Sequence, residues 1–145
     1  MIMRIFVISF AVLGAFWLYV RFAPTDAARW HHTPEATEPG DTVQPGNFRA
    51  VRRITAPAMD VLKAVEQRAL ATPRTVLLAG SAEQGMITFQ TRTQLWGFPD
   101  HTTVAVQGDL LVIYGRLRFG SADLGVNKAR IEGWLETLGP LTEPL

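Results

Sequence analysis

The fold depends most on residues 116–138, which read RLRFGSADLGVNKARIEGWLETL. This stretch continues an apolar run, passes through a turn bounded by Gly120 and Gly125, and then shows apolar residues at helical spacing. The apolar face consists of Ile131, Trp134, Leu135 and Leu138. Asn127 is a strong N-cap residue, and Gly139 followed by a proline is a typical stop. We therefore predict a strand, a short turn and a closing helix that begins at Asn127.

Upstream of this stretch, the chain predicts further strands and one more helix. Thr102–Gln107 and Leu110–Phe119 are separated by only two residues, which is typical of a β-hairpin. The other elements are a strand over residues 48–56, a helix from Pro57 to about Ala71, and strands over residues 75–79 and 86–93. Short connections favour antiparallel pairing. We predict an α+β fold in which an antiparallel sheet of about five strands carries both helices on one face.

The N-terminal segment is apolar on every side between Arg4 and Arg21. With its flanks it reaches about 20 residues, or roughly 30 Å as a helix, which is enough to cross a bilayer core. Trp17 and Tyr19 beside Arg21 resemble an interfacial belt. A cleaved signal peptide is the alternative, but bulky side chains stand where small residues would be needed. We therefore predict an uncleaved transmembrane signal anchor over residues 1–22.

Residues 23–46 change in composition to repeated proline and glycine with threonine and acidic residues. Such a segment should not support a helix or a packed strand, so we predict a Pro-rich tether. It leads to a domain over residues 47–139, followed by a tail over residues 140–145. His31 and His32 are adjacent in the tether, but adjacent residues do not share a face, and we expect no metal site there.

Composition excludes several kinds of function. The chain has no cysteine, which rules out disulfides, thiolate zinc sites and a cysteine nucleophile. It carries 14 lysine and arginine residues against 13 acidic ones, so it lacks the basic footprint that nucleic-acid binding requires. Neither a phosphate-binding loop nor a nucleophile elbow is present. We expect no nucleic-acid partner and no cofactor.

The glycine-bounded turn has two interpretations. Arg118, Asp123 and the N–H groups at the helix start could bind an anion. Alternatively, Asp123 accepts hydrogen bonds from the loop and pairs with Arg118, which would brace the turn. We favour the second interpretation.

Two further groups of residues are candidates. Asp100 and His101 are adjacent and could supply a general base, provided that they have a partner and a pocket. Trp96, Phe98 and Trp134 could line an apolar cavity or belong to the ordinary core. The candidate ligand-binding residues are therefore Trp96, Phe98, Arg118, Asp123 and Trp134.

The closing stretch carries a specific pattern. Its residues are Gly120, Asp123, Leu124, Gly125, Val126, Asn127, Arg130 and Ile131, and upstream come Phe98, Pro99 and Asp100. This text resembles the signature of a bacterial domain-of-unknown-function family, number fourteen-ninety-nine, over about residues 54–138. Where that family shows serines, this chain has Gly115, Leu117 and Ala122. The resemblance implies a fold but no activity.

A shorter likeness starts at Ile54 and reads ITAP. It resembles the opening of helix-grip domains of the START and polyketide-cyclase type. That resemblance implies an apolar ligand held between a curved sheet and a long terminal helix.

These observations lead to an expectation about function and place. We expect a non-enzymatic, single-pass protein of the bacterial inner membrane. Arg4 and the terminal amine flank one end of the anchor, whereas Arg21 and Arg29 flank the other, and we favour a periplasmic domain. The expected partners are the lipid bilayer and either an inner-membrane protein or complex or an apolar ligand.

The alternative is a small hydrolase-like or anion-binding enzyme. It would use Arg118, Asp123, Asp100 or His101. This alternative requires these side chains to converge around a cleft.

Overall fold

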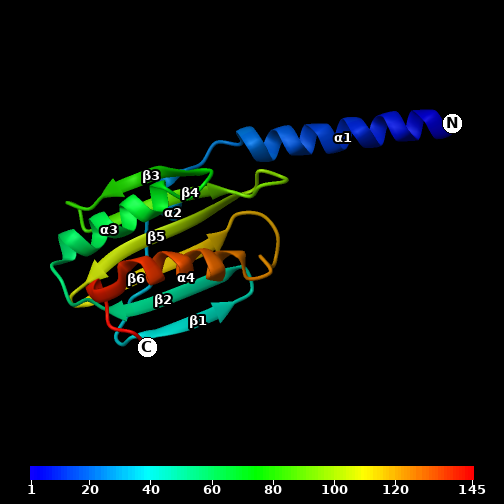
Figure 1. Cartoon of the computed structure of the whole chain (residues 1–145). Helices are drawn as coiled ribbons and strands as arrows, with labels where there is room; N and C mark the ends of the chain where they lie inside the picture. The colour runs from blue at the N-terminus through cyan, green and yellow to red at the C-terminus, as the bar shows by residue number, and fades with distance from the viewer.

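Six strands form a single antiparallel sheet in the computed structural model, which describes all 145 residues (Figure 1). Their order across the sheet is β1-β2-β6-β5-β4-β3. The strands are β1 (Gly40–Gln44), β2 (Asn47–Arg53), β3 (Thr75–Ser81), β4 (Met86–Arg92), β5 (Pro99–Gln107) and β6 (Leu110–Leu117). Each is paired antiparallel to its neighbours. The predicted α+β class is therefore confirmed, with six strands in place of about five.

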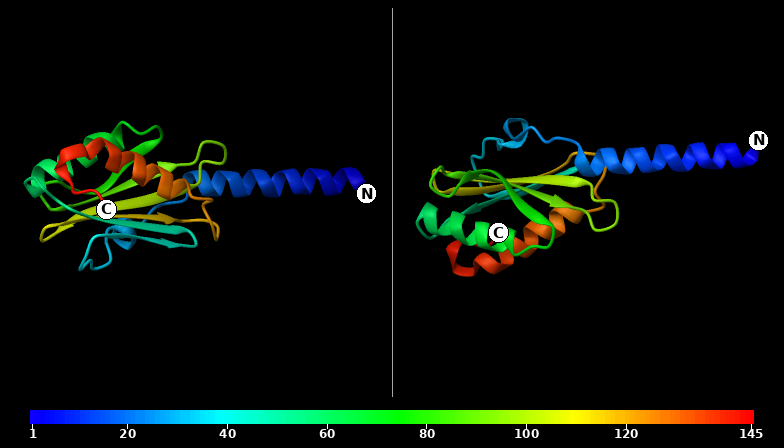
Figure 2. Two further views of the ribbon diagram at one scale, coloured as in Figure 1. Left: turned by 60° about the horizontal axis from the view of Figure 1, so that its bottom comes forward. Right: turned by 90° about the horizontal axis from the view of Figure 1, so that it is seen from above.

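Two helices, α3 (Ala58–Leu70) and α4 (Val126–Leu138), cover one face of the sheet (Figure 2). The last turn of α4 continues into η1 (Gly139–Leu141). The side chains that the helices and the strands bury against one another form one core cluster of 15 residues. Trp134 belongs to this cluster: its ring packs edge-to-face with Phe89, and its Nε1 donates to Thr72 Oγ1 at 2.9 Å.

The space between the helices and the sheet is filled. The facing side chains of α3, α4 and the strands are fully buried against one another. The ligand cavity that the helix-grip likeness implies is therefore not present in this structure. The apolar side chains between the helices and the sheet pack against one another and stabilise the fold.

The structure corrects three sequence-based bounds. Strand β1 lies inside the segment predicted as tether, because Pro39 and Pro45 flank the strand and do not interrupt it. Strand β5 begins at Pro99, earlier than predicted, since the first residue of a strand tolerates a missing N–H. Helix α4 has Gly125 as its N-cap residue, so the prediction that Asn127 caps it was wrong.

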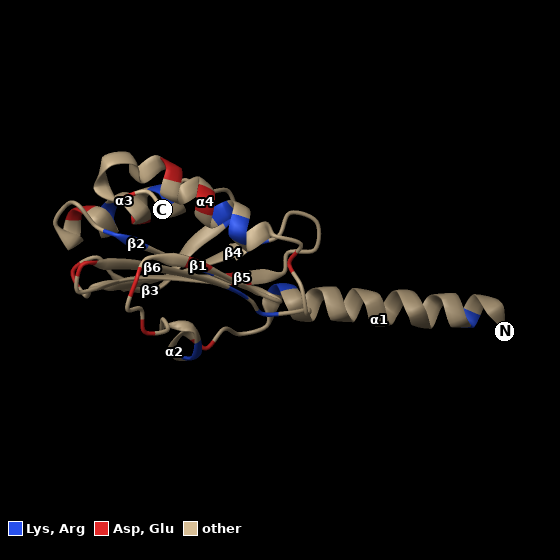
Figure 3. Ribbon diagram, turned by 90° about the horizontal axis from the view of Figure 1, so that it is seen from below, with Lys and Arg blue, Asp and Glu red and all other residues tan.

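The second face of the sheet is covered by residues 24–37, which include the short helix α2 (Ala27–Trp30) (Figure 3). We call this segment the strap. The Trp30 ring stacks on His101 with centroids 4.1 Å apart, and the Trp30 carbonyl accepts a hydrogen bond from Thr103 Oγ1 at 2.8 Å. His31 Nδ1 lies 2.9 Å from Thr88 Oγ1.

The expectation that residues 23–46 only tether the domain is thus corrected for the strap. Its low apolar content did not prevent packing, because polar side chains of the sheet bond to its backbone and side chains. Gln107, for example, donates to the Pro34 carbonyl and accepts from the Ala36 N–H.

Helix α1 (Ile2–Phe22) projects from one end of the domain (Figure 1). It is the one helix whose length and composition suffice to cross a membrane, with a mean hydropathy of 2.0 over its most apolar window. Its side chains are exposed except for Val20, close to the domain. The apolar helix that the sequence predicts is therefore present, and its burial against protein is minimal.

Candidate functional site

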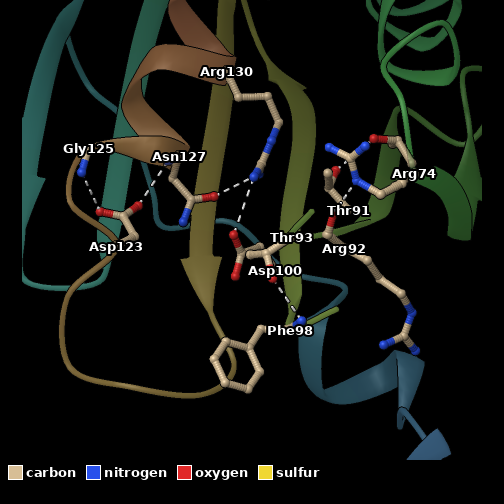
Figure 4. A network of polar contacts seen from close by, with 11 residues as sticks. Arg74, Thr91, Arg92, Thr93, Phe98, Asp100, Asp123, Gly125, Asn127 and Arg130 are labelled. Carbon is tan, nitrogen blue, oxygen red and sulfur yellow. Dashed lines mark hydrogen bonds and ion pairs between the residues drawn. The ribbon is translucent and has the colours of Figure 1, made fainter. Parts of the chain in front are cut away.

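The two pieces of sequence that carry the family resemblance meet at the first turn of α4 (Figure 4). Asp123 lies just before this helix, and its carboxylate accepts hydrogen bonds from the N–H groups of Gly125 at 3.0 Å and Asn127 at 2.9 Å. Burial acts to raise the pKa of Asp123, but these N–H groups outweigh it and lower the pKa below its ordinary value. Asp123 therefore satisfies donors at the start of the helix.

Arg130 joins the helix to the sheet (Figure 4). One turn into α4, its Nη1 donates to Asn127 Oδ1 at 2.8 Å and its Nη2 to Asp100 Oδ2 at 3.2 Å. The Asp100 side chain is 1% exposed and the Arg130 side chain 9%. Burial raises the pKa of Asp100, and the nearby Arg130 charge only partly opposes this. We call Asp100, Asp123, Asn127 and Arg130 the brace.

Three polar atoms in or beside the brace are buried without a hydrogen-bond partner: Asp100 Oδ1, Thr102 Oγ1 and Asn127 Nδ2. Gly115 of β6 faces the same region, and a Cβ there would lie 3.1 Å from Asn127 Oδ1 and 2.9 Å from Ile131 Cδ1. Glycine at this position allows α4 to lie close to the sheet. The brace is therefore tightly packed between α4 and the sheet.

The four side chains proposed for an enzyme do not converge. Asp100 and Asp123 lie on the face of the sheet that carries α4, whereas His101 lies under the strap against Trp30. Arg118 does not pair with Asp123; it donates to the Pro24 carbonyl and Thr25 Oγ1 at the start of the strap. The geometric condition for the enzyme alternative is not met.

The five residues predicted to bind a ligand are likewise dispersed. Trp134 belongs to the core and Asp123 to the brace. Trp96 is exposed in the loop between β4 and β5. Phe98 and Arg118 lie near the end of α1, where the Phe98 ring contacts Phe16. They do not line one common cavity.

Two segments of the domain hold the end of α1. Phe98 and Phe119 pack on each other and contact α1 through Phe16 and Tyr19. We call this contact the junction.

Arginines complete the junction through backbone carbonyls. Arg92 Nη1 donates to the Val20 carbonyl at 3.4 Å and to the Gly97 carbonyl at 2.8 Å. Arg118 Nη2 donates to the Pro24 carbonyl at 2.9 Å. Sequence reasoning missed Arg92 because its partners are carbonyls, one of them more than 70 residues away, and no acidic residue marks the contact. Its place at the end of a strand was the only signal.

A hollow opens beside the junction, between the end of α1 and strands β3 and β4. Its lining residues are Arg21, Arg74, Val76, Gln90, Arg92, Thr93, Gln94 and Gly97. The neighbouring loop tips expose apolar side chains: Leu95 is 80% exposed, and Leu124 in the loop after β6 is 97% exposed. Cations and exposed apolar side chains thus lie together at the end of the domain next to α1.

The fold and the junction define a class of protein: an α+β domain fixed directly to an N-terminal apolar helix that is long enough to act as a membrane anchor. The chain belongs to the family described as Protein of unknown function (DUF1499), whose model matches residues 23–138. No curated protein matches the chain. The matched range begins at the strap, which is consistent with the strap being part of the domain.

Proposed function

We propose that this protein is a single-pass membrane protein whose domain is held against the bilayer surface and works by contact with membrane components, without catalysis of its own. The observation that carries the proposal is the junction. Because Arg92 and Arg118 bond to the backbone on either side of the end of α1, no free linker separates the helix from the domain. If α1 spans the bilayer, the domain lies at its surface.

The composition of this end of the domain supports the proposal. Trp96 and Leu95 extend from the loop before β5, and Leu124 extends from the loop before α4. Tryptophan and apolar side chains mixed with arginine are typical of the membrane interface. The opposite end of the domain carries Glu83 and Asp109 in its turns.

The bilayer is therefore the first partner that we propose. An inner-membrane protein or complex, or an apolar ligand, would bind at the same end, because the interior of the domain is filled. We also propose the bacterial inner membrane as the location, with the domain in the periplasm.

Site-directed spin labelling tests the contact with the bilayer. The chain has no cysteine, so single cysteines at Leu95, Leu124, Glu83 and Asp109 can each carry a nitroxide on the full-length protein in liposomes. We expect labels at positions 95 and 124 to collide more with oxygen than with a water-soluble nickel complex. Labels at positions 83 and 109 should show the reverse. Aqueous values at all four positions would refute the proposal.

The side of the membrane is tested separately by fusing alkaline phosphatase to the C-terminus, because this enzyme is active only outside the cytoplasm. We expect an active fusion, and an inactive fusion when residues 2–22 are deleted. An inactive fusion of the full chain that is made in normal amount would place the domain in the cytoplasm and overturn the proposed orientation.

A further inference from the structure

We propose that the hollow beside the junction binds the phosphate group of a phospholipid. This inference rests on the proposed function, since it requires the domain to lie at the bilayer surface. The hollow has a volume of about 340 Å³ and is formed by the last turn of α1, by β3 and β4, and by the loop that follows β4. Three of its lining residues are arginines from separate segments: Arg21 of α1, Arg74 of the turn before β3 and Arg92 of β4.

These three arginines have no acidic partner. The ion pairs of the structure involve other cations, namely Arg52, Arg53, Lys63, Lys128 and Arg130. Arg92 is partly buried, and this burial together with the charges of Arg21 and Arg118 lowers its pKa below the ordinary value. The guanidinium groups of Arg21 and Arg92 act on each other as like charges with no carboxylate between them, and such a pair forms a site that an anion would stabilise. Arg74 lines the same hollow, where its Nε donates to the Arg92 carbonyl at 3.0 Å.

The local backbone favours this gathering of charge. Gly97 has a φ of 72°, and Arg21 Nη1 lies 3.2 Å from the point where a Cβ would stand. A larger residue at this position would be strained and would crowd the Arg21 guanidinium. Glycine therefore allows the arginine of α1 to reach the loop that carries the rest of the site.

The lining residues fit a phosphate in particular. A guanidinium presents paired N–H donors that match phosphate oxygens, and such charge-assisted hydrogen bonds are stronger than neutral ones. Thr93 and Gln94 add neutral polar groups to the same wall. Thr93 Oγ1 already accepts a hydrogen bond from the Phe98 N–H at 2.9 Å, which leaves its own hydroxyl proton to donate.

The position of the hollow points to a lipid phosphate. Arg4 and Arg21 are 17 residues apart on α1, or about 26 Å at 1.5 Å per residue, so they span nearly the thickness of a hydrocarbon core. When α1 crosses a bilayer, Arg21 lies at the level of the phosphates. Leu95 and Trp96 in the neighbouring loop would then contact the interface beside the same lipid.

Binding of phosphatidylglycerol to the full-length protein in dodecyl maltoside micelles tests the inference. Native mass spectrometry would count the lipid retained during a titration. We expect one tight site in the wild type, and an apparent Kd raised at least tenfold in the double variant Arg21→Gln, Arg74→Gln. This variant loses the exposed bond from Arg74 Nε to the Arg92 carbonyl but keeps the Arg92 side-chain bonds to the Val20 and Gly97 carbonyls, so the junction should remain folded.

The matched control is Arg68→Gln with Lys128→Gln, which removes the same charge from α3 and α4 on the far face of the sheet. It should bind lipid as the wild type does. Equal lipid affinity in the Arg21→Gln, Arg74→Gln variant and the wild type would overturn the inference, provided that thermal melting shows both proteins to be folded. An equal loss in the control would also overturn it, since the effect would then be one of net charge.

A second titration separates a lipid from a free anion. We expect short-chain dihexanoyl phosphatidylglycerol to bind at least tenfold more tightly than inorganic phosphate, and the lipid binding to depend on Arg21 and Arg74. If inorganic phosphate binds as tightly as the lipid, the hollow is an anion site and the lipid inference is wrong. If the spin labels at positions 95 and 124 lie in the bilayer but the Arg21→Gln, Arg74→Gln variant binds lipid as tightly as the wild type, only this inference fails. Aqueous labels would instead refute the proposed function.

Discussion

Acidification from pH 6.5 towards pH 3 should destabilise the domain by several kcal/mol through His101 alone. This side chain is fully buried between β5 and the strap, stacked on Trp30, and neither ring nitrogen has a hydrogen-bond partner. Burial, with the charges of Arg116, Arg118 and Arg92 acting in the same direction, lowers the pKa of His101 from 6.5 to about 3. The folded domain therefore holds this imidazole neutral.

The direction of the effect follows from proton binding. Between pH 6.5 and pH 3 the unfolded chain protonates His101 and the folded chain does not, so the free energy of unfolding falls as the pH falls through this window. A pKa difference of about 3.5 at roughly 1.4 kcal/mol per unit gives a loss on the order of 5 kcal/mol at the lower end. Above pH 6.5 the contribution of His101 is constant.

Urea unfolding of the full chain in detergent, followed by tryptophan fluorescence between pH 7 and pH 4.5, measures this contribution. The variant His101→Phe keeps an aromatic ring on Trp30 but cannot titrate. We expect its free energy of unfolding to fall more slowly with acid than that of the wild type, by up to about 1.4 kcal/mol per pH unit. Each protein is referred to its own value at pH 7, so a general loss of stability does not imitate the effect. Parallel curves would show that His101 does not contribute.

The sheet and its two helices could be predicted because their signals are local. The two-residue link at Gly108 and Asp109 predicts the hairpin of β5 and β6, and the apolar stripe ending at Leu138 predicts α4. Such patterns depend on neighbours in sequence. The number of strands was underestimated because β1 is an edge strand whose only apolar residue, Val43, is exposed, so it shows no apolar alternation.

The strap could not be predicted because its partners lie far away in sequence. Alternating Thr88, Gln90 and Arg92 favours a strand with one face in water. In the structure that face is polar because the carbonyl and imidazole groups of the strap lie on it. A segment that packs through polar groups carries no apolar pattern, so its composition is the same as that of a free linker.

For the functional residues too, local contacts could be predicted and contacts between distant segments could not. The favoured interpretation of Asp123 as a brace for the turn predicts its bonds to Gly125 and Asn127, but the expected pair with Arg118 is wrong. Arg130 was part of the resemblance and not among the candidate residues, because no local pattern joins it to Asp100, 30 residues earlier. The arginines of the hollow come from three separate segments of the chain and were missed for the same reason.

Replacing Arg130 by methionine should lower the free energy of unfolding by an amount similar to the His101 effect. The substitution keeps an apolar stem but leaves Asp100 buried without its cation, and breaking a buried pair from one side costs about 3–5 kcal/mol. Burial already raises the pKa of Asp100, and loss of the Arg130 charge removes the main opposing influence. A carboxyl group whose pKa is higher in the folded than in the unfolded state lowers the free energy of unfolding as the pH rises. The deficit of Arg130→Met should therefore be largest at neutral pH and smaller near pH 4.

The double variant Asp100→Asn, Arg130→Met separates the cost of an unpaired buried charge from the cost of altered packing. It removes both charges, so we expect it to recover more than half of the stability that Arg130→Met loses at pH 7. Lys128→Met is the matched control, because it removes a cation from an exposed pair with Glu132 on the same helix and should change stability by less than about 0.5 kcal/mol. If Arg130→Met and Lys128→Met lose the same free energy of unfolding in urea, the brace does not hold α4 to the sheet.

If the brace is structural, the Arg130→Met variant, measured at a low temperature where it is still folded, should keep the lipid affinity of the wild type. The reason is that the hollow and the brace share no residue.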